Sequence, residues 1–195
     1  MLKVVDKLIK KSNHLFEFID LGGGMGISYE KNSKKLNFKI YNSLINKFLK
    51  KNNCKIIFEP GRSIIGNAGI LISKIIYIKK SKNKNFVILD AAMNDLMRPA
   101  LYGAKHQIIP SIKNKKNLNK IFEFVGPICE STDKFLTINK FQKIKEGDVL
   151  IICDSGACGM SLSSNYNVRP LSTEILIKNS KIQVIRNRQK LSDLI

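Results

Sequence analysis

Two short apolar runs near the start of the chain enclose a segment with helical spacing. Residues 15–21 and 54–58 are apolar and end at glycine-containing turns, which is typical of buried strands. Between them, residues 34–50 place apolar side chains on one helical face. Strand, helix and strand form a βαβ unit with parallel strands. Because a single unit leaves both sheet faces and edges uncovered, we expect it to be part of a larger, truncated structure. Residues 1–11 alternate apolar side chains with lysine and predict the end of an amphipathic helix rather than a signal peptide.

The pattern changes after Arg62 to short strand-like runs that no strong amphipathic helix separates. These runs are residues 64–77, 86–90, 121–125, 149–153, 174–177 and 181–185. Polar, charged connectors are expected at residues 79–85 and 113–120. Such runs predict a mostly antiparallel β domain. We therefore expect an α/β part over residues 1–65 and a β domain over residues 66–195.

The charge of the chain is strongly positive but is carried mainly by lysine. The net charge is +19 over 195 residues, and only five of the 34 basic residues are arginine. Nucleic-acid surfaces rely on arginine for bidentate and stacking contacts, and no nucleic-acid motif is present. A solvated lysine-rich surface is therefore favoured over a nucleic-acid partner. No run approaches the ~20 apolar residues that span a bilayer, so we expect no membrane partner.

The four cysteines, Cys54, Cys129, Cys153 and Cys158, form no Cys-x-x-Cys pair. No histidine lies at metal-ligand spacing from them. Free thiols, a cytoplasmic location and no metal site are expected.

A glycine-containing loop follows each of the first two predicted strands. Gly22-Gly23-Gly24-Met25-Gly26 can bring backbone N–H groups around a phosphate, although a tight structural turn is the alternative. Its spacing does not fit the nucleotide-binding motifs. The carboxylate of Glu59-Pro60-Gly61-Arg62 can keep a pyridine nitrogen protonated, and a surface Glu–Arg pair is the alternative. In a parallel barrel, both loops would face one pocket.

Further polar motifs lie in the second half of the chain. Cys129 and Glu130 join a thiol to a carboxylate, which can donate a proton and bind a cation, although cysteine is more often a small core residue. Arg98 and Tyr102 are suited to gripping a carboxylate, with a structural ion pair as the alternative. His106 is expected to be a hydrogen-bonded structural residue.

Together these motifs resemble the second half of diaminopimelate decarboxylase, a pyridoxal-phosphate (PLP) enzyme. The matching stretches, in the family's order, are IDLGGGMGISY, FEPGRSIIGNAG, LDAAMNDLMRPALYGAKH, VGPICEST and GACGMSLSSNYNVRP. The resemblance covers about residues 18–177. It implies the alanine-racemase-like fold: the last strands of an incomplete parallel (β/α)8 barrel over residues 1–65, and a mostly antiparallel β domain over residues 66–195.

The resemblance implies a cofactor site and a substrate site. The implied PLP contacts are Gly23 and Gly24 at the phosphate, Glu59 at the pyridine nitrogen, Pro60, Gly61 and Arg62 beside them, and Tyr166. The implied contacts of meso-diaminopimelate are Arg62, Arg98, Tyr102, Glu130 and Tyr166. Cys129 would return a proton to the carbon that has lost carbon dioxide. In the family the active site lies at a homodimer interface, where Cys129 and Glu130 reach the partner's pocket.

The chain also departs from the family pattern. Cys158 stands where the family usually has tyrosine, and Thr132 where glycine is common. No lysine here matches the motif of the family's PLP-carrying lysine, so we expect this chain alone to be inactive. The alternatives are a decarboxylase of another basic amino acid, such as ornithine or arginine, and a non-catalytic binding remnant with a basic surface. Arg98 favours diaminopimelate, because ornithine has no distal carboxylate.

Overall fold

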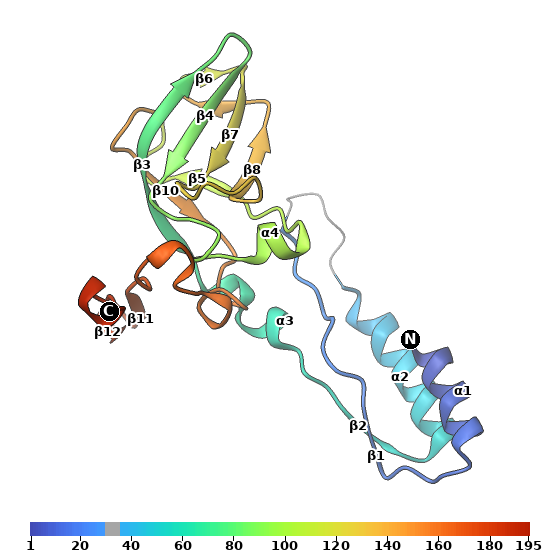
Figure 1. The fold of residues 1–195 in the computed structure, drawn as a ribbon. Coiled ribbons are helices and arrows are strands. Elements are labelled where there is room, and N and C mark those ends of the chain that lie inside the picture. The colour runs from blue at the N-terminus through green and yellow to red at the C-terminus, as the bar shows by residue number, and fades with distance from the viewer. Residues whose placement is uncertain (30–35) are drawn as a thin grey trace. The chain divides into compact units, whose positions relative to one another are not determined.

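The computed structural model describes residues 1–29 and 36–195, which form two compact units, Met1–Gly66 and Asn67–Ile195 (Figure 1). Among these residues, no helix combines the length and the apolar character that crossing a membrane requires.

In its described residues, the first unit contains a parallel strand pair and three helices. They are α1 (Leu2–Ser12), β1 (Phe18–Asp20), α2 (Phe38–Asn52), β2 (Lys55–Ile57) and α3 (Gly61–Ile65). β1 and β2 pair in parallel, as the strand–helix–strand pattern predicted. The side chain of Asn37 begins α2 by accepting hydrogen bonds from the backbone N–H groups of Lys39 and Ile40. The predicted start at residue 34 was too early, and residues 34 and 35 themselves lie outside the described residues.

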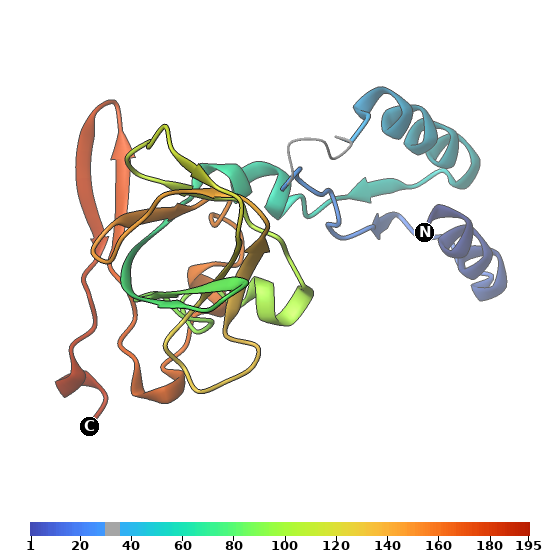
Figure 2. The same ribbon diagram turned by 90° about the horizontal axis from the view of Figure 1, so that it is seen from above.

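The second unit is built on a six-stranded sheet with the order β5-β10-β3-β4-β7-β8. Its strands are β3 (Leu71–Lys80), β4 (Lys84–Leu89), β5 (Ile108–Pro110), β7 (Ile121–Val125), β8 (Lys134–Ile138) and β10 (Val149–Ile152). Neighbours are antiparallel except for β4 and β7. The domain is therefore mostly antiparallel, as predicted, with one parallel pair. Seen from above, the strands curve around a central core (Figure 2).

Two small antiparallel pairs complete the second unit. β6 (Asn117–Leu118) pairs with β9 (Phe141–Gln142), and β11 (Glu174–Lys178) pairs with β12 (Lys181–Arg186). Short helical segments are α4 (Arg98–Tyr102), η1 (Gly66–Ala68, which begins in the first unit), η2 (Met160–Leu162), η3 (Tyr166–Val168) and η4 (Leu191–Asp193).

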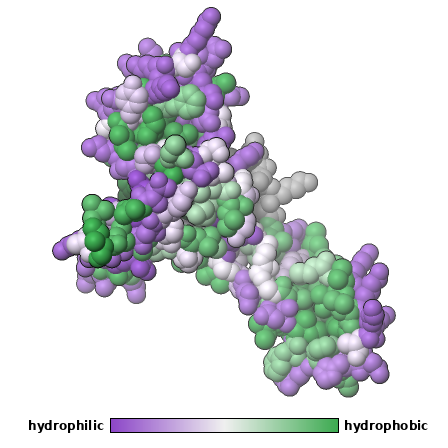
Figure 3. All heavy atoms as spheres, viewed as in Figure 1, coloured by the Kyte–Doolittle hydropathy of each residue, from purple (hydrophilic) through white to green (hydrophobic). Residues whose placement is uncertain are grey.

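The core of the second unit follows from alternation along its strands. Every second residue of β4, β7 and β10 is buried, because successive strand side chains point to opposite faces. Phe122, Phe124 and Phe141 form an aromatic cluster within this core. By contrast, apolar side chains gather on the surface of the first unit over α1 and α2 (Figure 3), where Leu8 and Ile40 are exposed.

The structure corrects two predicted boundaries. Residues 64–70 were expected to begin a strand, but they end α3 and form η1, and β3 begins at Leu71. A side chain at Gly69 would collide with the backbone of Gly156, so this segment is shaped by a close backbone approach. The connector expected at residues 79–85 is mostly strand: β3 ends at Lys80 and β4 begins at Lys84, whose half-buried side chain pairs with Glu123.

Candidate active site

The two glycine-containing loops lie side by side in the first unit. The backbone N–H of Leu21 donates to the oxygen of Ile57 at 3.0 Å, and that of Glu59 donates to the oxygen of Gly22 at 2.9 Å. These bonds continue the parallel pairing beyond β1 and β2. Since the carboxyl ends of parallel strands meet at one edge, Gly23, Gly24 and Glu59 come together there.

Close packing explains why glycine occupies position 23. A Cβ atom on Gly23 would lie 2.5 Å from the backbone oxygen of Glu59, which is too close for any side chain. Gly24 has a φ of +82°, a region that glycine adopts without strain. The loop is thus a backbone turn without intervening side chains, and this fits a phosphate held by N–H groups.

Replacing Gly23 with alanine should force the two loops apart. Overpacking of this kind typically costs ~1–3 kcal/mol of unfolding free energy. Denaturant unfolding of the purified chain measures the cost. Gly26→Ala is the matched control, because among the described residues no heavy atom beyond the chain neighbours lies within 4 Å of a Cβ placed there. Equal stability of the two variants would contradict the close packing.

The second loop continues from Glu59 into α3. Glu59 is exposed, so its carboxylate is accessible to a ligand. Pro60 precedes α3, and Gly61 and Arg62 form the first turn of that helix. The predicted cofactor residues other than Tyr166, which belongs to the second unit, therefore lie on one pair of adjacent loops.

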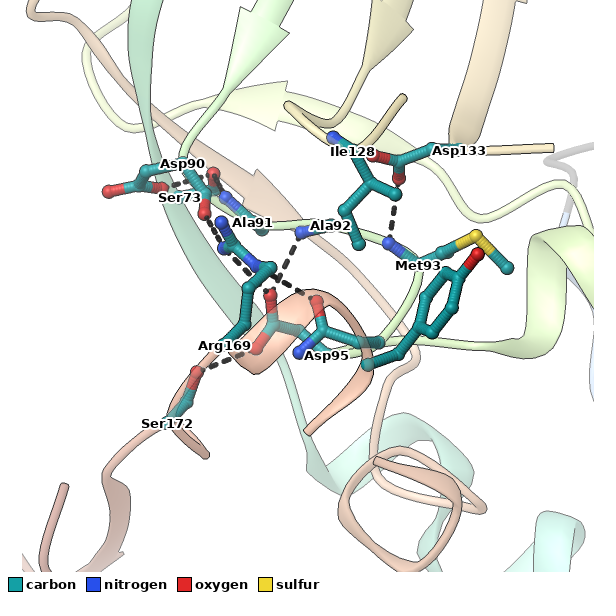
Figure 4. A network of polar contacts seen from close by, with 12 residues as sticks. Ser73, Asp90, Ala91, Ala92, Met93, Asp95, Ile128, Asp133, Arg169 and Ser172 are labelled. Carbon is teal, nitrogen blue, oxygen red and sulfur yellow. Dashed lines mark hydrogen bonds and ion pairs between the residues drawn. The ribbon is translucent and has the colours of Figure 1, made fainter. Parts of the chain in front are cut away.

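Three loops meet in the second unit beside the end of β4, and we name them by their residues: the 90–97, 126–133 and 163–172 loops (Figure 4). The carboxylate of Asp133 joins the first two. It accepts hydrogen bonds from the backbone N–H of Met93 at 2.7 Å and of Ile128 at 2.8 Å. Burial raises the pKa of Asp133, while these two backbone donors oppose the rise.

Arg169 joins the 163–172 loop to the 90–97 loop. Its Nε donates to Oδ1 of Asn94 at 3.0 Å, and its Nη2 donates to the backbone oxygen of Asp90 and lies 3.5 Å from Oδ2 of Asp95. Figure 4 shows the guanidinium directed at the 90–97 loop. Ser172 adds a hydrogen bond from its Oγ to Oδ1 of Asp95 at 3.1 Å.

The buried side chain of Asn94, on the 90–97 loop, is hydrogen-bonded to the start of the 163–172 loop. Its Nδ2 donates to the backbone oxygen of Ser164 at 2.9 Å, and the Ser164 N–H donates back to the oxygen of Asn94 at 3.1 Å. The 90–97 loop therefore supports both of the other loops.

The predicted substrate residues form two pairs in this unit. The Tyr166 hydroxyl lies 3.4 Å from Oε2 of Glu130, and both residues are exposed together with Cys129. The guanidinium of Arg98 lies 5.3 Å from the ring centre of Tyr102. Arg98 is only 5% exposed whereas Tyr102 is 61% exposed, so the tyrosine is the more accessible member.

Sequence reasoning assigned no role to four residues that build this arrangement: Asn94, Asp95, Asp133 and Arg169. All four lie in or beside the quoted motifs, and that was the available signal. His106 is buried, with its Nδ1 2.9 Å from the backbone oxygen of Cys153, which agrees with the predicted structural role.

Comparison with known proteins places this arrangement in a family. Residues 4–156 match the family model described as the pyridoxal-dependent decarboxylase C-terminal sheet domain. The chain belongs to the pyridoxal-dependent decarboxylase family. Curated relatives include diaminopimelate decarboxylase of Zymomonas mobilis, 42% identical over 95% of this chain and 44% of that protein. The enzyme of Helicobacter pylori is 44% identical over 91% of this chain and 44% of its own length.

Solved structures of diaminopimelate decarboxylases are also similar to this chain in fold. The Helicobacter pylori diaminopimelate decarboxylase complexed with L-lysine matches with a TM-score of 0.83 and 41% identity, over 99% of this chain and 47% of that one. The diaminopimelate decarboxylase from m. jannaschii, also in complex with L-lysine, gives a TM-score of 0.86 and 36% identity over 99% of this chain and 46% of that one. The chain thus spans less than half the length of these relatives.

Proposed function

We propose that this chain forms part of the active site of a PLP-dependent diaminopimelate decarboxylase, which converts meso-diaminopimelate to L-lysine and carbon dioxide. The observation that carries the proposal is the packing of Gly23 against Glu59, since it sets a glycine backbone turn beside an exposed carboxylate. Residues 1–65 would be the last strands of an incomplete (β/α)8 barrel, and residues 66–195 its β domain.

The loops of the first unit would bind the cofactor. Gly23 and Gly24 would donate backbone N–H groups to the PLP phosphate, with Gly61 and Arg62 nearby. PLP, when bound, supplies an electron sink for the bond to the departing carboxylate. The carboxylate of Glu59 would hold a proton on the pyridine nitrogen, which keeps that sink effective.

The loops of the second unit would bind the substrate and move a proton. Arg98 and Tyr102 would hold the distal carboxylate, while Glu130 would bind the distal ammonium and Tyr166 would contact both substrate and cofactor. Cys129, exposed beside Glu130, would deliver the proton that replaces carbon dioxide. We place this site at a homodimer interface, to which Cys129 and Glu130 contribute from the neighbouring subunit.

A chimera tests the proposal directly. It would join this chain behind the amino-terminal part of the Helicobacter pylori relative, which this chain does not match. We expect the chimera to retain PLP through purification and to release carbon dioxide from meso-diaminopimelate but not from ornithine. A chimera that folds and binds no PLP would overturn the proposal.

The 195-residue chain by itself should release no carbon dioxide, because none of its lysines matches the PLP-carrying motif. The measurement is release of labelled carbon dioxide from carboxyl-labelled meso-diaminopimelate with added PLP. The chimera at equal concentration is the positive control. Release by the chain alone, at the rate of the chimera, would refute this expectation.

Replacing Arg98 with alanine in the chimera should weaken the binding of meso-diaminopimelate while leaving PLP bound. Losing a charge-assisted hydrogen bond typically costs ~1.5–3 kcal/mol, or roughly ten- to a hundredfold in affinity. Substrate KM and the PLP absorbance are measured together. Arg186→Ala is the control, since Arg186 pairs with Glu174 in the β11–β12 hairpin. Loss of PLP with an unchanged KM would show the assignment of Arg98 to be wrong.

A further inference from the structure

The backbone around Tyr166 has an unfavourable conformation. Asn167 and Val168 follow Tyr166 with φ values of 58° and 56°. Asparagine enters this left-handed region readily, but a β-branched residue such as valine is a genuine outlier there. Residues held in such conformations persist only when the surrounding contacts fix them. Something near Val168 must therefore hold this bend.

Arg169 is the residue placed to do so. It directly follows the bend, and its guanidinium has three acceptors on the 90–97 loop: the side chains of Asn94 and Asp95 and the backbone oxygen of Asp90. The arginine side chain is 28% exposed and that of Asp95 only 6%, so solvent screens these contacts less than it would screen a surface pair. The planar fork of arginine spreads its donors over three nitrogens in a fixed geometry, whereas the donors of lysine all lie on one nitrogen and cannot span acceptors that are spaced apart.

The same 90–97 loop also fixes the partner of Tyr166. Met93 donates to the carboxylate of Asp133, which in turn accepts from Ile128, two residues before Glu130. One short loop is thus bonded to the segment that carries Tyr166 and to the segment that carries Glu130. The 3.4 Å separation of the Tyr166 hydroxyl and the Glu130 carboxylate depends on both attachments.

We infer that Arg169 is a positioning residue that holds the 166–168 bend against the 90–97 loop and thereby sets Tyr166 beside Glu130. Arg169 itself need not touch substrate or cofactor. Its importance for catalysis rests on the proposed function, in which Tyr166 contacts substrate and cofactor and Glu130 reaches the site of the neighbouring subunit. The positioning itself is a property of the ligand-free chain.

The test measures whether Tyr166 senses Glu130 in the ligand-free chain. Tyrosines are labelled with 3-fluorotyrosine, and the fluorine resonance of Tyr166 is identified by its absence in Tyr166→Phe. In the otherwise unchanged chain, Glu130→Gln should shift this resonance. In Arg169→Lys and Arg169→Gln, the same Glu130→Gln change should shift it by roughly half as much or less, since the fork is lost.

Matched variants separate positioning from a general loss of structure. Arg186→Lys alters another paired arginine of this unit and should leave the Tyr166 shift intact. Arg169→Lys keeps the positive charge. If Arg169→Gln does not melt cooperatively, the outcome is judged on Arg169→Lys. A full Glu130-dependent shift in folded Arg169→Lys would overturn the inference. Because no PLP or substrate is present, a chimera that fails to bind PLP would overturn the proposed function and leave this result standing.

Discussion

Replacing Cys129 with alanine in the active chimera should slow lysine formation by ~100-fold or more, the usual contribution of a positioned proton donor. Cys129 is exposed and adjacent to Glu130, on a loop that the buried carboxylate of Asp133 fixes at Ile128. In the proposed site, the thiol would lie within reach of a substrate bound by Glu130 and would give its proton to one face of one carbon.

The two products distinguish this role from substrate binding. Carbon dioxide leaves before the proton arrives, so a single turnover of Cys129→Ala should release carbon dioxide faster than it forms lysine. PLP binding and substrate affinity should stay close to those of the unchanged chimera.

The other cysteines provide matched controls. Cys54 lies in the first unit beside β2, and Cys158 is exposed outside the 126–133 loop. Cys54→Ala and Cys158→Ala should keep most activity. Two results would exclude Cys129 as the donor. One is a normal rate of lysine formation by Cys129→Ala, and the other is lysine formation that lags behind carbon dioxide release in Cys158→Ala alone.

Replacing Asp133 with alanine should lower the free energy of unfolding more than replacing Gly23 does. Asp133 is 3% exposed, and its carboxylate accepts the backbone N–H groups of Met93 and Ile128. Each donor left buried without a partner costs ~1–3 kcal/mol, so the variant should lose ~2–6 kcal/mol. The carboxylate also fills the space beside Gly126, which the variant would leave empty.

Denaturant unfolding of the chain measures this loss, with Asp148→Ala as control. Asp148 accepts one backbone N–H, from Lys145 at 2.9 Å, on an exposed turn. Its removal should therefore cost ~1 kcal/mol or less. Similar losses of unfolding free energy in Asp133→Ala and Asp148→Ala would show that Asp133 does not hold the 90–97 and 126–133 loops together.

The contribution of Asp133 to the free energy of unfolding should also depend on pH. Burial raises the pKa of Asp133 in the folded chain, so folding favours its protonated form. Stability from this group is then present in full below its unfolded pKa and decreases as pH rises through the folded pKa. The stability difference between the unchanged chain and Asp133→Ala should accordingly be larger in mild acid than at neutral pH.

The sequence by itself determined the features that local patterns encode. Alternation located β7 at Ile121–Val125, and the strand–helix–strand order predicted the parallel pairing of β1 with β2. The glycine-containing motifs carried the family resemblance, which the comparisons bear out. These signals are readable because each depends on residues that are close in sequence.

Only the tertiary structure decided how the loops support one another. Arg169 is 74 residues from Asp95, and Asp133 is 40 residues from Met93, so no local pattern reports their bonds. The left-handed Val168 is equally hidden, because valine normally indicates extended backbone. The burial of Arg98 also depends on packing rather than on its motif. The sequence therefore predicted which residues would meet a ligand, whereas only the long-range hydrogen bonds of the folded chain point to residues that would hold them in place.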